Sequence, residues 1–161
     1  MKRLFWSLVL VLVLGTVAQA AIIHAGPSGT GNGTSWNDIA NFNTLSLVRG
    51  NTYFLQDGTY AGRDFGTALS GTTLITIKKA VPTGTTGCVA PNCHGSETGW
   101  SDAYGDGQAT FSSLSFLTSY WVFDGAKRNE SNWQQTSAYG FFISALGEVY
   151  LAAHVRDITM R

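Results

Sequence analysis

Two aromatic residues, Trp100 and Tyr104, lie in a glycine-rich stretch where their side chains could stack on sugar rings. An aromatic side chain offers a flat apolar face, and Trp and Tyr add a polar tip, which suits them to carbohydrate contacts. The alternative is that both rings pack this stretch against the body of the protein. Trp100 and Tyr104 are therefore possible glycan contacts.

Two aspartates in the same stretch, Asp102 and Asp106, raise the question of a calcium-binding loop. An EF-hand loop needs an oxygen ligand at its third position and a bidentate Glu at its twelfth. Counted from Asp102, these positions hold Tyr104 and Ser113, so the pattern fails. Asp beside Gly is typical of a turn, and the sequence predicts no metal site and no evident cofactor.

The chain has two cysteines, Cys88 and Cys93, and His94 follows directly. These three residues could be zinc ligands, but the spacing is C-x4-C and no second ligand pair is present. Residues 1–20 resemble an export signal, and an even pair of cysteines in an exported chain instead predicts a local disulfide. Closing so short a loop stabilises the fold by about 2 kcal/mol on the chain-entropy model.

Strand-like segments surround a long loop at 81–108. They are rich in β-branched and aromatic residues, and several alternate apolar with polar positions. The predicted strands cover 52–56, 59–60, 73–79, 110–112, 114–117, 120–124, 141–144, 149–151 and 155–160. The segments 73–80, 120–128 and 154–161 are alike in kind, which favours a repeat with unequal intervals.

A helix is predicted earlier, over residues 36–46. Ser35 followed by Asp38 matches a capping box, and Trp36, Ile39 and Phe42 contribute to a rough apolar stripe.

Residues 1–20 have the three parts of a secretory signal peptide. Lys2 and Arg3 precede an apolar run from Leu4 to Leu14, and Ala18-Gln19-Ala20 fits a cleavage site. The run is shorter than the roughly 20 residues that span a membrane. We expect a secreted domain at 21–161, extracellular or periplasmic, with no membrane association after cleavage.

The charge of this domain is small. Residues 1–20 hold two of the ten basic residues and none of the ten acidic ones, so residues 21–161 have a formal charge of −2. Without a basic patch, no nucleic-acid partner is expected.

Three stretches resemble the opening of secreted right-handed parallel β-helix proteins of the pectate-lyase-like superfamily, which have the pectin lyase fold. They are Gly-Pro-Ser-Gly-Thr-Gly-Asn-Gly-Thr-Ser-Trp-Asn-Asp at 26–38, Arg-Gly-Asn-Thr-Tyr-Phe-Leu-Gln-Asp-Gly-Thr-Tyr at 49–60, and Leu-Ile-Thr-Ile-Lys at 74–78. Asn51 replaces an Asp that is usual in the family. The resemblance implies an all-β solenoid with a short N-terminal capping helix, and a polysaccharide partner, which in this family can be acidic.

Polysaccharide lyases neutralise the substrate carboxylate with Ca²⁺ or basic side chains and remove a proton with a base. The candidate cations are Lys78, Lys79, Arg128 and Arg156. The alternative is that they are solvated charges that protect strand edges. No base can be assigned, so the catalytic residues are unknown, and Ca²⁺ belongs to the full-length parent that the resemblance implies.

Length favours an N-terminal fragment, because the residues after 50 support only about four coils of roughly 20 to 30 residues. Three functions fit this pattern. The first is the cap and first coils of a polysaccharide lyase or glycoside hydrolase, without a complete active site. The others are a non-catalytic surface or matrix β-helix and a small glycan-binding β protein.

Overall fold

The computed structural model describes residues 20–85, 88, 92–127, 139–144 and 146–161. The predicted signal peptide therefore lies outside the described residues, apart from Ala20. Within them the regular structure consists of short strands and a single 3-10 turn, η1 (Asp102–Tyr104). The strands are β1 (Ile22–Gly26), β2 (Ala40–Asn41), β3 (Thr52–Leu55), β4 (Gly58–Tyr60), β5 (Arg63–Phe65), β6 (Ile75–Lys79), β7 (Ala109–Phe111), β8 (Leu114–Phe116), β9 (Trp121–Asp124), β10 (Phe141–Ile143), β11 (Val149–Leu151) and β12 (Ile158–Met160).

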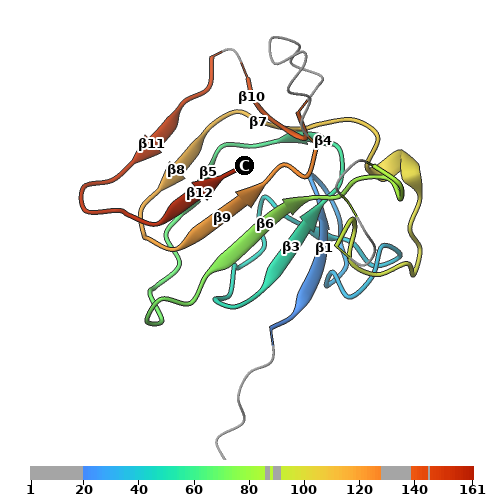
Figure 1. Ribbon diagram of the computed structural model, residues 1–161, viewed down its shortest axis with the longest axis horizontal. Coiled ribbons are helices and arrows are strands. Elements are labelled where there is room, and N and C mark those ends of the chain that lie inside the picture. Colours follow the sequence, from blue (N-terminus) through green and yellow to red (C-terminus); the bar gives the residue numbers. More distant parts are fainter. Residues whose placement is uncertain (1–19, 86–87, 89–91, 128–138, 145) are drawn as a thin grey trace, which may run out of the picture.

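All of these strands belong to three parallel sheets, so the all-β prediction is confirmed. Sheet A has the order β12-β9-β6-β3-β1-β2, sheet B has β10-β7-β4, and sheet C has β11-β8-β5. From β3 onward the chain visits sheets A, B and C in turn and then returns to A. Figure 1 shows β1, β3, β6 and β9 side by side although long connections separate them in the sequence.

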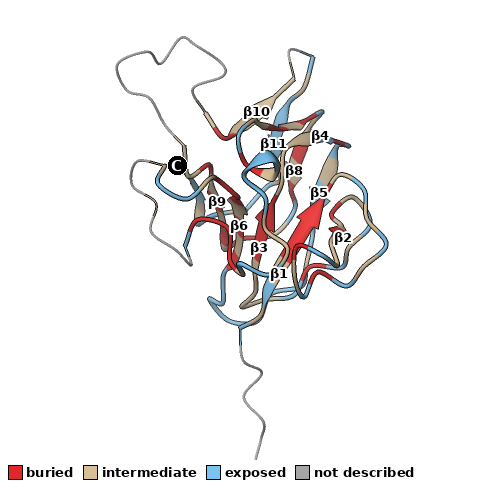
Figure 2. Ribbon diagram, turned by 90° about the vertical axis from the view of Figure 1, so that its right-hand side faces the viewer, coloured by how far each residue is buried: buried red, intermediate tan, exposed pale blue. Residues whose placement is uncertain are grey.

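The three sheets enclose an aromatic core. Parallel strands lie about 4.8 Å apart, so inward side chains at matching positions stack on one another. Tyr60 stacks on Phe111 with ring centroids 4.9 Å apart, and Phe65 stacks on Phe116 at 5.1 Å. Figure 2 shows the buried residues along the strands and many exposed residues on the connections between them.

The predicted helix over 36–46 is wrong. These residues form turns and the short strand β2, and no capping helix is present in the described part of the chain. A backbone hydrogen bond joins two residues of this region instead, with Gly33 N donating to Asp38 O at 2.7 Å. Trp36 and Phe42 are buried in two different clusters, which one continuous helical stripe would not allow.

An irregular segment at 42–49 closes the N-terminal end of the core in place of the helix. Its polar groups form hydrogen bonds with β5 and with a residue between β4 and β5. Asn43 Oδ1 accepts a hydrogen bond from Ala61 N at 3.1 Å, and Arg63 donates to the Leu45 carbonyl. The Arg63 guanidinium lies 4.4 Å from the centre of the Phe42 ring, so this arginine also covers the end of the core.

Arg49 ties together the connections that lead from sheet C back to sheet A. Its guanidinium donates to the carbonyl of Thr67 at 2.8 Å and to those of Ser119 and Tyr120 at 2.9 Å each. It also lies 4.8 Å from the centre of the Trp121 ring. A planar fork of five N–H donors suits this set of acceptors better than a single ammonium would.

Candidate functional site

A groove of about 190 Å³ lies on the outward face of sheet A. The strands alternate between core and outward side chains, so parallel pairing stacks the outward ones in columns. Thr52 pairs with Thr76 in one column, and Phe54 pairs with Lys78 in the next. The lining residues are Ile22, Thr52, Phe54, Thr76, Lys78, Asn92, Asp124 and Arg161.

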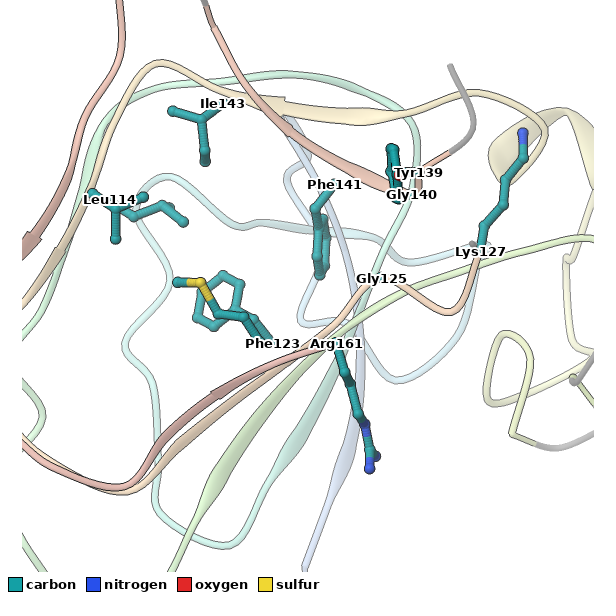
Figure 3. A pocket seen from close by; sticks show the side chains of 11 residues that line it. Leu114, Phe123, Gly125, Lys127, Tyr139, Gly140, Phe141, Ile143 and Arg161 are labelled. Carbon is teal, nitrogen blue, oxygen red and sulfur yellow. The ribbon is translucent and has the colours of Figure 1, made fainter. Parts of the chain in front are cut away.

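The charges of the groove are arranged around Asp124. Lys78 pairs with Asp124 in the strand register, and its Nζ lies 3.8 Å from Asp124 Oδ2. Arg161 Nη2 lies 3.1 Å from the same oxygen. Two cations around one carboxylate leave a net positive charge on this face. Figure 3 shows the Arg161 side chain turned away from the side chains of Phe123 and Phe141.

The groove therefore combines charge, hydroxyl groups and an aromatic ring. Lys78 Nζ lies 5.8 Å from the centre of the Phe54 ring, and Thr52 and Thr76 add side-chain hydroxyls. Such a surface can bind a carboxylate or a row of hydroxyl groups. Asp124 is the one carboxylate among the described lining residues, and both cations already engage it, so it is poorly placed to act as a free general base.

The aromatic residues proposed from the sequence lie elsewhere, in the loop between β6 and β7. Trp100 stacks on His94 with ring centroids 4.0 Å apart and meets Trp36 edge-on at 5.0 Å. Tyr104 lies 5.8 Å from Trp36. Both rings are partly buried and pack the loop onto Trp36. Their role as glycan contacts stays a prediction.

The disulfide between Cys88 and Cys93 is confirmed. The two sulfur atoms bond each other, so the zinc alternative with His94 loses its thiolate ligands. Among the residues that the structure describes, no group of three His, Cys, Asp or Glu side chains is placed to hold a metal ion. A disulfide is typical of an oxidising compartment.

Lys79 is not a solvated strand-edge charge, because its side chain points into the protein and is 0% exposed. Its Nζ lies 2.5 Å from Asp57 Oδ1 and donates to the carbonyls of Ala80 at 2.5 Å and Gly105 at 3.5 Å. Burial lowers the pKa of Lys79, although the hydrogen bond to Asp57 opposes this. The lysine joins the end of β6 to the β3–β4 corner beneath the long loop.

The remaining charged candidates do not converge on the groove. Arg156 is exposed and lies 3.6 Å from Asp157. Arg128 lies outside the described residues. Asp102 accepts a hydrogen bond from Trp100 Nε1 at 2.9 Å, and Asp106 is exposed, which agrees with a role in turns.

The groove was only partly visible in the sequence. Lys78 was a candidate, whereas Phe54, Asp124 and Arg161 were not. A signal was present, because the similar segments 73–80, 120–128 and 154–161 contain β6, β9 and β12, which are neighbours in sheet A. Reading the same outward position in each of these segments would have found Lys78, Asp124 and Arg161.

A second hollow, of about 250 Å³, is apolar and lies where the core is left open by the last strands (Figure 3). Its lining includes Phe123, Phe141, Val149 and Met160. Val149 is 45% exposed, although it pairs in register with Leu114, which is buried. These side chains face inward, and no described strand lies above them, so we regard this hollow as the exposed end of the core.

No helix in the described part of the chain is both long enough and apolar enough to cross a membrane. Comparison with protein-family models, curated proteins and solved structures gives no match.

Proposed function

We propose that this chain forms coils of a secreted right-handed parallel β-helix that binds or degrades polysaccharide. The observation that carries the proposal is the outward groove of sheet A, where Lys78 and Arg161 flank Asp124 beside the hydroxyls of Thr52 and Thr76. Export is supported by the predicted signal peptide and agrees with the disulfide.

The strand order supports a solenoid. The chain visits the three parallel sheets in a fixed order, and from β6 onward each strand pairs with its counterpart one turn earlier. This is the connectivity of a three-sided coil. Parallel β-to-β connections are right-handed in nearly all proteins. The resemblance of residues 26–38, 49–60 and 74–78 to pectate-lyase-like proteins points to the same architecture.

The strands β10, β11 and β12 carry exposed apolar side chains at one end of the stack. These strands are the last ones in sheets B, C and A, and no described strand lies beyond the inward side chains of β11 and β12. Leu151 and Met160 are 54% and 49% exposed there. Covering these side chains would stabilise the stack by roughly 25 cal/mol for each Å² of apolar surface removed from water.

The ligand that fits the groove best is an acidic polysaccharide. Successive strands place one side chain about every 4.8 Å along a column, so a chain of sugars lying across the strands meets repeated hydroxyl and charged groups. The excess of cations favours a carboxylate on the sugar over a neutral ring. A non-catalytic binding role is the second candidate, because the described groove residues include no free carboxylate to act as a base.

Calorimetric titration with an oligogalacturonate tests this proposal. We expect Lys78→Gln and Arg161→Gln each to weaken binding by about tenfold, the loss of roughly 1.4 kcal/mol expected for one charge-assisted contact. Arg156→Gln is the matched control, since Arg156 is an exposed arginine outside the groove lining. A neutral cello-oligosaccharide tests the charge preference. Equal affinity in all three variants would overturn the assignment of the groove.

A further inference from the structure

His24 is a buried histidine on β1 whose two ring nitrogens both have partners. It is 1% exposed. Nδ1 lies 2.9 Å from the Gly33 carbonyl oxygen, and Nε2 lies 3.0 Å from the Ser96 amide nitrogen. A carbonyl only accepts and an amide N–H only donates, so these partners require a neutral ring with its proton on Nδ1.

The backbone at 95–96 rests directly on this ring. A Cβ at Gly95 would lie 2.8 Å from His24 Nε2 and 2.9 Å from Ile22 Cγ2, and Gly95 has a φ of +75°. The other sides of the ring face Trp36, edge-on at 4.9 Å, and Phe54, stacked at 6.5 Å. No side chain other than hydrogen therefore fits at Gly95 while the loop touches the histidine.

The contact between His24 and residues 95–96 affects the shape of the groove, because the segment 92–100 contributes Asn92 to the groove wall. Asn92 lines the groove, and so do Ile22 and Phe54, which contact the His24–Gly95 pair. Other bonds also hold this segment, including Trp36 Nε1 donating to the His94 carbonyl at 2.8 Å. Loss of the His24 contact would therefore loosen the wall rather than unfold the protein.

The surroundings of His24 disfavour its charged form. Burial lowers the pKa of His24, the hydrogen bond to the Gly33 carbonyl opposes this, and the nearby His94 lowers it further. Charged groups on the neighbouring elements are Asp38 on the 31–39 segment, Glu97 beside His94, and Lys78, whose Nζ lies 5.8 Å from the centre of the Phe54 ring. None of them forms an ion pair with His24 among the described residues.

Protonation would place a second N–H on Nε2, directly opposite the Ser96 N–H. Two donors cannot bond each other, so this hydrogen bond is lost and a charge is buried among aromatic rings. The folded state lowers the pKa of His24. The stabilisation from the Ser96–His24 hydrogen bond is therefore fully present above about pH 6.5, and it is lost as the pH falls through the pKa of His24 in the folded protein. Within that window the equilibrium shifts up to tenfold for each pH unit.

We propose that His24 is an acid-sensitive latch that holds the 92–100 segment against β1 and so shapes one wall of the groove. Above pH 7 the latch is closed. In acid it opens, the wall loosens, and a ligand in the groove is released. The release of a glycan rests on the proposed function, whereas the latch itself does not.

NMR of the ligand-free protein with labelled histidines and amides tests the latch between pH 8 and 4.5. We expect the His24 ring, the Ser96 amide and the Trp36 indole N–H to change with one shared midpoint below pH 6.5. His24→Gln can keep both hydrogen bonds and should abolish that transition at Ser96. His154→Gln, which changes an exposed histidine, should leave it intact.

The wild-type titration decides the question even if His24→Gln fails to fold. The proposal is overturned if His24 titrates while the Ser96 amide and its exchange protection stay unchanged, or if the transition survives in a folded His24→Gln protein. Measuring oligogalacturonate affinity at pH 7.5 and 5 then separates the two ideas. A latch that opens without any glycan binding at either pH would refute the proposed function alone.

Discussion

The buried pair of Lys79 and Asp57 offers the sharpest test of how the fold holds the long loop. Lys79 is fully buried, Asp57 is 20% exposed, and their charged atoms lie 2.5 Å apart. Gly107 N also donates to Asp57 Oδ2 at 2.5 Å, so the loop returns onto this pair. Burial dominates the lowered pKa of Lys79, which means that desolvation offsets much of the attraction between the two charges.

Removing both partners should therefore cost less than the sum of the two single losses. Lys79→Met leaves the Asp57 carboxylate in a partly buried corner, and we expect a loss of about 3 kcal/mol in the free energy of unfolding. This is the low end of the usual range because water reaches Asp57. Asp57→Asn should cost about 2 kcal/mol, since it leaves the ammonium without its counter-charge. The double variant should be less destabilised than the sum by at least about 1 kcal/mol.

Urea denaturation followed by tryptophan fluorescence measures all three variants. Lys78→Met is the matched control, because Lys78 is the neighbouring residue on the opposite face of β6 and lies 3.8 Å from Asp124. We expect it to cost less than about 1 kcal/mol. Additive effects of the two single changes, or equal losses for Lys78→Met and Lys79→Met, would refute the buried-pair reasoning.

Two further predictions concern single residues. Arg49→Lys keeps the charge but loses the planar guanidinium, and it should lower the free energy of unfolding by about 2 kcal/mol in the same urea experiment. A loss under about 0.5 kcal/mol would contradict the role of Arg49 in joining the connections that run from sheet C to sheet A. Gly95→Ala places a methyl group against His24 at a positive φ, which by itself costs about 1 kcal/mol. Gly95→Ala should raise the rate of amide hydrogen exchange in the 92–100 segment. Gly71→Ala is the control, because Gly71 also has a positive φ but a Cβ there would meet open space. Unchanged exchange at 92–100 would argue against the close contact between Gly95 and His24.

The sequence predicted most of the strands because their residues alternate clearly. The predicted segments 52–56, 114–117 and 149–151 correspond to β3, β8 and β11 within a residue or two. It missed β5 (Arg63–Phe65), where Asp64 and the following Gly66 obscure the apolar pattern. Three-residue strands depend on pairing across the stack, and local sequence carries little of that information.

The helix prediction failed because local signals competed with distant contacts. Ser35 and Asp38 have the spacing of a capping box, yet Asp38 Oδ2 accepts from the Asn32 backbone N–H at 3.3 Å instead. Trp36 is drawn to Trp100, 64 residues further along the chain, at a ring distance of 5.0 Å. Such long-range burial outweighs the weak helix preference of a short segment.

The candidate site depended on register, which spacing alone does not give. Lys78, Asp124 and Arg161 meet because β6, β9 and β12 are neighbours in sheet A, although 46 positions separate Lys78 from Asp124 and 37 separate Asp124 from Arg161. The burial of Lys79 was hidden for the same reason. Two adjacent lysines look equivalent in sequence, but alternation along β6 sends one outward and the other into the protein.

Mapping where an acidic oligosaccharide binds tests the central claim most directly. Amide chemical shifts of the ¹⁵N-labelled protein are recorded while an oligogalacturonate is added. The proposed groove predicts saturable shifts at Thr52, Thr76 and Lys78 on the outward face of sheet A, with smaller changes elsewhere. Shifts confined to Trp100 and Tyr104 would move the site to the loop, and the absence of any saturable shift would contradict glycan binding by this chain.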